Sequence, residues 1–307
     1  MLNVMSLFRA MPGSLAQGLI WGILALGVYL TFKILNFADL TVDGSLATGG
    51  AVAVMLILNG WSPIIVLSVS FLAGVTAGLV TAFLNTALGI PDILAGILTQ
   101  IALYSINMNI MGKSNQAVSI DKYNLVVTLR HIPLAIVNTT LFLVVIVALL
   151  YWYFGTEQGF TIRATGCNPN MARAQGINTN TAKILALALS NGLVGLAGGL
   201  YAQYQGNADV NMGRGAIVIG LAAVIIGEVL GEAIFRKRLN FVARLVFVIL
   251  GAVIYYIVIT FVLWLGLPSQ NLKLFSAIVV AVFLAIPNLR AKSKASFKKS
   301  AKNGGER

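Results

Sequence analysis

The sequence has little of what builds a catalytic, metal or nucleotide site. Cysteine and histidine occur once each, as Cys167 and His131. A single cysteine excludes an internal disulfide and a cysteine metal cluster, and His131 has no neighbours at metal-ligand spacing. The segment MGKS at 111–114 ends like a phosphate-binding loop, but Asn107 stands where that motif requires its first glycine. We therefore expect no enzyme activity, no metal and no cofactor bound by this chain itself.

Charged residues are also scarce, at 10% of the chain against 58% hydrophobic residues. A soluble domain carries about 25% charged residues, so most of this chain is expected to lie in lipid. Several apolar runs reach the roughly 20 residues that a membrane-spanning helix needs. The sequence therefore predicts an all-α, polytopic transmembrane helical bundle.

The apolar runs predict about nine spans, within a range of roughly eight to ten. They form a single transmembrane domain over residues 1–288, followed by a basic tail at 289–307. The N-terminal segment MLNVMSLFRAMPGS lacks the pattern of a cleavable signal peptide. The expected spans are 15–35, 44–60, 62–88, 91–111, 132–154, 182–204, 215–235, 241–266 and 273–289.

The formal charge of +12 gathers in short loops and in the tail. Basic residues cluster at 236–244, and a run of lysines and arginines follows the last apolar segment. Positive charge of this kind marks the cytoplasmic side of a membrane protein. We therefore expect the C-terminus and the loop 155–181 in the cytoplasm and the N-terminus outside. The same distribution favours membrane lipid over nucleic acid as a partner.

Small residues recur four positions apart within the predicted spans. Such pairs let helix backbones approach closely in lipid, where packing drives association. They predict a tightly packed bundle. The pairs are Gly18 and Gly22, Gly74 and Gly78, Gly195 and Gly199, and Gly227 and Gly231.

Two stretches echo each other, GILALGVYLTFKILNFADLTVDG at 22–44 and GLVGLAGGLYAQYQGNADVNMGRG at 192–215. Each runs from a glycine-rich helix through a tyrosine to an asparagine and then Ala-Asp. Because their helices cross in opposite senses, they predict an inverted repeat whose broken helices line the pathway. The candidate pathway residues are Asn36, Phe37, Asp39, Thr41, Asp43, Asn207 and Asp209.

Three acidic side chains allow other interpretations. Asp43 is placed to cap the second span, because an aspartate oxygen accepts the free amides of a first helical turn. The position of Asp39 is equally consistent with a helix cap and with a residue that lines the substrate pathway. Glu228 stands one helical turn before Glu232 and two before Arg236, which favours a structural ion pair over a proton relay. Lys33, near a helix end, is expected to extend to the lipid headgroups.

One polar segment, GFTIRATGCNPNMARAQGIN at 159–178, lies in a loop of about 27 residues where a few would suffice. Asn168 as a cap and Pro169 at the first position predict a short helix that ends at Gly176. Its apolar face is too small for firm membrane binding, which favours a protein partner. The helix is expected to present Met171, Ala172, Ala174 and Gln175.

This segment resembles the cytoplasmic coupling segment of bacterial ABC importer permeases, in the family that contains the ribose and branched-chain amino-acid permeases. Two further stretches are similar to that family, ALALSNGLVGLAGGLYAQYQG and GILALGVYLTFKILNFADLTVDGSLATGGAVAV. The resemblance covers most of the chain and looks closest to the uncharacterised or aromatic amino-acid importer branch. The chain departs from the family at Gly227-Glu228, where Gly-Gly is usual, and we expect it to lack the extra N-terminal span of the ribose-type permeases. The matching loop residues are Gly159, Ile162, Arg163, Ala164, Gly166, Asn168, Ala172, Gly176, Ile177 and Asn178.

The resemblance implies a permease subunit in the bacterial plasma (inner) membrane. Two copies would form a homodimer, each docked on one of two ABC ATPase subunits that carry ATP and Mg²⁺. An extracellular solute-binding protein or lipoprotein would deliver a small solute, with an amino acid favoured. The coupling residues implied are Arg163, Ala164, Thr165, Gly166, Asn168, Met171, Ala172, Arg173, Gln175 and Gly176.

Two other functions remain open from the residues alone. An ion-coupled secondary transporter would carry protons on Asp39, Asp43 or Glu228, because ionisable groups inside spans are costly and often functional. A passive channel would need none of these groups. Transport that continues with ATP after the proton gradient has collapsed separates the importer from the secondary transporter.

Overall fold

The computed structural model describes residues 4–120, 122–235 and 239–265, together with a few positions between 274 and 285. Helices dominate this part of the chain, which confirms the predicted all-α bundle. The elements in chain order are α1 (Val4–Tyr29), the π-helix η1 (Leu30–Leu35), α2 (Val42–Leu58), α3 (Pro63–Thr86), α4 (Asp92–Met111), β1 (Asn115–Ala117), α5 (Ile132–Phe154), α6 (Glu157–Cys167), α7 (Pro169–Ala174), α8 (Thr179–Gln205), β2 (Asn207–Asp209), α9 (Ala216–Phe235) and α10 (Phe241–Trp264).

The first eight predicted spans each coincide with one of these helices. Seven helices are long and apolar enough to cross a membrane, and α2 is a shorter apolar helix. The first helix begins at Val4, well before the predicted start at residue 15. The ninth predicted span, 273–289, lies largely outside the described residues, as do the basic residues 236–238 and the tail.

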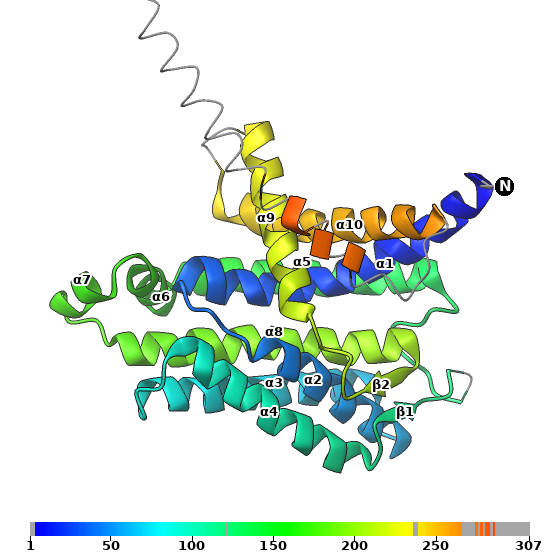
Figure 1. The fold of residues 1–307 in the computed structure, drawn as a ribbon, viewed down its shortest axis with the longest axis horizontal. Helices are drawn as coiled ribbons and strands as arrows, with labels where there is room; N and C mark the ends of the chain where they lie inside the picture. Colours follow the sequence, from blue (N-terminus) through cyan, green and yellow to red (C-terminus); the bar gives the residue numbers. More distant parts are fainter. Residues whose placement is uncertain are drawn as a thin grey trace, which may run out of the picture.

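Helix α8 lies at the centre of the bundle, between α1 on one side and α2 and α3 on the other (Figure 1). Most of α8 and nearly all of α2 are buried. Helices α3, α4 and α5 expose large aliphatic and aromatic side chains. Because such side chains would be unfavourable in water over so wide an area, this surface is suited to lipid.

The close packing around α8 depends on glycine. A Cβ atom at Gly195 would meet the carbonyl oxygen of Ser70 on α3, and one at Gly74 would meet the carbonyl of Asn191 on α8. A Cβ at Gly49 on α2 would likewise meet the Gly195 carbonyl. In each of the four predicted glycine pairs, at least one member lies against the backbone of another helix, which confirms the prediction of tight packing.

The chain is broken at both of the echoing segments. After η1, Asn36 takes the left-handed conformation (φ 57°), and a short extended stretch leads to α2. After α8, Gly206 is also left-handed, and β2 and a turn lead to α9. Strand β2 pairs antiparallel with β1, with Gln116 opposite Ala208. The β1–β2 pair and the hairpin of α6 and α7 lie at opposite ends of the bundle (Figure 1).

Candidate functional site

Helices α6 and α7 form a hairpin, residues 157–175, that projects from one end of the bundle (Figure 1). The side chain of Asn168 accepts hydrogen bonds from the backbone amides of Asn170 and Met171, both at 3.1 Å. Pro169 occupies the first helical position, and α7 gives way to Gly176 at φ +81°. The short capped helix predicted from the sequence is therefore confirmed.

The hairpin is fixed to the bundle through α6, which packs against η1 and α8. A Cβ atom at Gly166 would meet the carbonyl oxygen of Ile34, so the two backbones are in direct contact. The neighbouring Ile162 and Thr165 side chains are buried. Such a contact leaves little room for the hairpin to move without η1.

Arg163 faces the bundle and not the tip of the hairpin. Its guanidinium lies over the ring of Phe241, at 4.3 Å from the centroid, and near that of Phe154, at 5.4 Å. Arginine binds aromatic faces through their negative quadrupole. Arg163, one of the implied coupling residues, therefore braces α6 against α5 and α10.

The prediction that α7 presents Ala172 to a partner is wrong. Ala172 is only 4% exposed, because the chain folds back over it and Ile177 donates its amide to the Ala172 carbonyl. Met171, by contrast, is 62% exposed. Of the implied coupling residues, Ala164, Thr165 and Gly166 lie within α6. The exposed members are Asn168, Met171, Arg173, Gln175 and Gly176.

Asp39 lies in the first break and is 2% exposed. One carboxylate oxygen accepts the Thr41 amide at 2.9 Å, and the other accepts the side-chain amide of Asn191 at 2.7 Å. Asn191 in turn accepts a 2.6 Å hydrogen bond from the Ser45 hydroxyl. This network joins the break to the middle of α8. Both carboxylate oxygens of Asp39 are therefore hydrogen-bonded within the protein, as expected of a buried residue that stabilises the fold.

A second polar cluster continues from the same break. The Thr41 hydroxyl is hydrogen-bonded to that of Thr81 at 2.6 Å, and Thr81 donates to Thr99 at 2.9 Å. Phe37 is buried and its ring lies 5.7 Å from the Lys183 ammonium, whereas Asn36 is exposed. These side chains connect α2, α3, α4 and α8.

Asp43 caps a helix, but not the one predicted. Its two carboxylate oxygens accept the backbone amides of Gly215 and Ile217, each at 2.9 Å. Those amides belong to the start of α9, whereas α2 has Thr41 at its cap position without a side-chain hydrogen bond. Asp43 therefore ties the N-terminus of one broken helix to the N-terminus of the other.

The second break repeats the local structure of the first. Asp209 accepts the amide of Asn211 at 2.6 Å, just as Asp39 accepts the amide two positions further on. Asn207 is exposed on β2, paired with Ala117. The two candidate pathway residues of this break lie at the β1–β2 end of the bundle.

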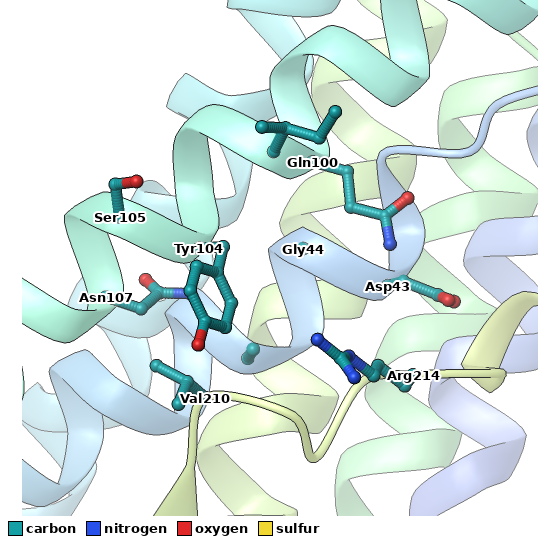
Figure 2. A pocket seen from close by; sticks show the side chains of 10 residues that line it. Asp43, Gly44, Gln100, Tyr104, Ser105, Asn107, Val210 and Arg214 are labelled. Atoms are coloured by element: carbon teal, nitrogen blue, oxygen red, sulfur yellow. The ribbon is translucent and has the colours of Figure 1, made fainter. Parts of the chain in front are cut away.

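A cavity of about 300 Å³ adjoins Asp43, between α4, the start of α2 and the segment 206–215 that links α8 to α9. Figure 2 shows the side chains of Gln100, Tyr104 and Arg214 around it. Of the predicted pathway residues, only Asp43 lines this cavity. The residues of α4 that line the cavity were not predicted, because isolated polar residues in an apolar helix form no recognisable motif.

Glu228 forms an ion pair between two segments that lie far apart in the sequence. Its carboxylate forms an ion pair with the Lys33 ammonium at 2.8 Å, which joins η1 to α9. Lys33 therefore does not extend freely to the lipid headgroups. The arginine predicted to follow the acidic pair, Arg236, lies outside the described residues. In the part of the chain that is described, no three His, Cys, Asp or Glu side chains gather as a metal site.

The chain matches the family described as branched-chain amino acid transport system / permease component, over residues 11–287. It is 41% identical over 280 residues to the tyrosine transport system permease protein of Clostridioides difficile (strain R20291), which covers 91% of this chain and 92% of that protein. It is 27% identical over 271 residues to the galactofuranose transporter permease protein YtfT of Escherichia coli (strain K12), covering 87% and 76%. It is 25% identical over 280 residues to the ribose import permease protein RbsC of the same strain, covering 89% and 84%. No solved structure gives a significant match.

Proposed function

The chain belongs to the family of branched-chain amino acid transport system permease components, and on that premise we propose that it forms the translocation pathway of an ATP-driven importer. Its substrate is a small solute, an amino acid in our proposal. An extracellular binding protein or lipoprotein delivers that solute. ATP and Mg²⁺ bind to a separate ATPase subunit, and two permease copies pair with two ATPase copies in the plasma membrane.

The observation that carries this proposal is the projecting hairpin of α6 and α7. It presents the exposed Met171 at its tip, while Gly166 holds its base against the backbone of η1. A large exposed side chain on a short, firmly supported helix fits a groove on a partner protein. We place this end of the bundle in the cytoplasm, where the ATPase subunit would contact it.

The mechanism follows from the contacts behind the hairpin. Closure of the ATPase dimer would push the hairpin, and Gly166 would transmit the push to η1 and the first break. Asp43 then connects the start of α2 to the start of α9. ATP shifts the populations of outward-open and inward-open states only by binding them with different affinity. In this mechanism the hairpin couples the nucleotide state of the ATPase subunit to the conformation of the permease.

Replacement of Met171 by Asp tests the docking surface. A charge at the centre of an apolar contact is expected to lower ATP-dependent uptake and permease-stimulated ATP hydrolysis by about 10-fold or more. The assay uses the permease in proteoliposomes with its ATPase and binding protein. The matched control is Asn180→Asp, which adds the same charge to an exposed position at the start of α8. Wild-type uptake by the Met171→Asp protein would refute the docking assignment.

The single cysteine supplies an independent measurement. Cys167 is exposed at the end of α6. A membrane-impermeant maleimide should label it from the cytoplasmic side only, and addition of the ATPase subunit should protect it. Labelling from outside would show that the hairpin lies on the extracellular side of the membrane. Labelling that the ATPase subunit leaves unchanged, together with intact uptake by Met171→Asp, would exclude the hairpin as the contact.

A further inference from the structure

The cavity beside Asp43 contains polar groups that the bundle leaves without partners. Arg214 is exposed and borders the cavity, and within the described residues its guanidinium forms no hydrogen bond and no ion pair. The Gln100 side chain, which points to the same space in Figure 2, also has no partner in this part of the chain. An unpaired cation in a cavity is suited to an anionic group.

Asn107 provides a second and independent observation. It lines the cavity and is only 1% exposed, yet neither its oxygen nor its nitrogen has a hydrogen-bond partner. Figure 2 shows its side chain directed from α4 toward Tyr104 and the cavity. Buried amides are almost always hydrogen-bonded, so an orphan one requires a ligand or a bound water. A carboxylate would accept a hydrogen bond from its nitrogen.

The remaining lining narrows the chemistry of the ligand. Asp43 contributes a carboxylate, whose oxygens already accept two backbone amides but retain lone pairs for a third donor. Ile101 and Val210 contribute apolar surface. The cavity therefore combines a free cation, an anion, a buried amide and an apolar wall. Its volume of about 300 Å³ is at the lower limit of small-molecule sites.

We propose that this cavity is a binding site within the permease for a free α-amino acid. Arg214 and the Asn107 amide bind the carboxylate, Asp43 accepts the ammonium group, and the apolar wall receives the side chain. This inference rests on the proposed function, which already takes an amino acid as the substrate, and it adds a binding site for that substrate within the permease. An uncharged sugar would form no charge-assisted hydrogen bond with Arg214, so the site is expected to bind it more weakly than an amino acid.

The test measures binding to the purified full-length permease in lipid nanodiscs, without ATPase or nucleotide. The probes are L-tyrosine and L-leucine, with tyramine as the analogue of tyrosine that lacks a carboxylate and D-ribose as the uncharged solute. Competition with radiolabelled L-tyrosine and saturation-transfer NMR detect weak binding. The wild-type protein is expected to bind both amino acids and to bind tyramine and ribose at least about 10-fold more weakly.

Two variants address the anionic subsite, each with a matched control. Arg214→Gln should weaken amino-acid binding by about 10-fold or more, because a charge-assisted hydrogen bond is lost. Its control is Arg9→Gln, at an exposed position of α1. Asn107→Leu should weaken binding while the melting temperature stays equal or rises, because an unsatisfied buried amide is removed. Its control is Asn109→Leu, on the exposed side of the same helix.

The outcomes separate this site from the transport function. Equal binding of tyramine and L-tyrosine, or wild-type binding by Arg214→Gln, overturns the site. So does the absence of amino-acid binding to the wild-type permease, even if ATP-driven uptake is intact. Amino-acid binding without ATP-driven uptake in the complete complex refutes the importer and leaves the site standing. Arg214→Lys, which keeps the charge, should retain part of the affinity if Arg214→Gln fails to fold.

Discussion

Removal of the Asp43 carboxylate should loosen the start of α9, although the two lie 172 residues apart in the sequence. The carboxylate accepts the backbone amides of Gly215 and Ile217 at 2.9 Å each. Among the described residues, no side chain of the 206–215 segment accepts a hydrogen bond from either of these two amides. Asp43→Ala would therefore leave two amides without their acceptor and remove a negative charge from the positive end of a helix.

The magnitude follows from these two bonds. A hydrogen bond to a charged group contributes about 1.5–3 kcal/mol, so the loss of both should cost about 3–6 kcal/mol. Water that enters the adjoining cavity would recover part of this free energy, which makes about 3 kcal/mol the safer figure. Asp43→Asn keeps one acceptor oxygen and should cost roughly half as much.

Hydrogen exchange measured by mass spectrometry is the suitable assay, because a polytopic membrane protein rarely unfolds in two states. A loss of about 3 kcal/mol in local stability should accelerate exchange of amides 215–217 by about 100-fold. Asp209→Ala is the control, since Asp209 binds only its own turn. If Asp43→Ala accelerates exchange at 215–217 by less than about 5-fold, the carboxylate does not hold the two helices together.

Two further variants test the polar contacts of the breaks. Asn191→Leu removes the donor to the buried Asp39 carboxylate, so it should lower the stability of the detergent-solubilised protein by about 3 kcal/mol or more, seen as a lower melting temperature than for Asn180→Leu. Lys33→Gln breaks an ion pair whose lysine is 45% exposed, so a double-mutant cycle with Glu228→Gln should yield a coupling of less than about 1 kcal/mol. A larger coupling would show that this pair is a structural tie between η1 and α9.

The sequence predicted the features that depend on neighbouring residues. Apolar runs of sufficient length located the helices, because a span must bury its backbone polar groups within itself. Asn168 and Pro169 located α7, because a cap and a first-turn proline act within one turn. Both breaks were also predicted, from the similarity of the two segments, and the structure places left-handed residues there, at Asn36 and Gly206.

The features that depend on distant contacts were missed. Asp43 has the sequence of a cap for α2, and only the folded bundle brings the start of α9 within reach of its oxygens. Ala172 fits an exposed helix face, but the return of the chain toward α8 covers it. The cavity takes side chains from α2, α4 and the 206–215 segment, so no local pattern marks it.

Among the buried polar side chains of this bundle, we compare those that have hydrogen-bond partners with those that have none. Asp39 and Asn191 are buried and fully engaged, as expected of side chains that hold a break in place. Among the described residues, the buried side chains without partners are Trp21, Thr139 and Asn107. Trp21 and Thr139 each leave one atom unpaired, whereas Asn107 leaves both of its polar atoms unpaired in a cavity that the exposed Arg214 also borders. Unsatisfied buried polar groups are expected at functional sites, so Asn107 supports the binding site that we propose in this cavity.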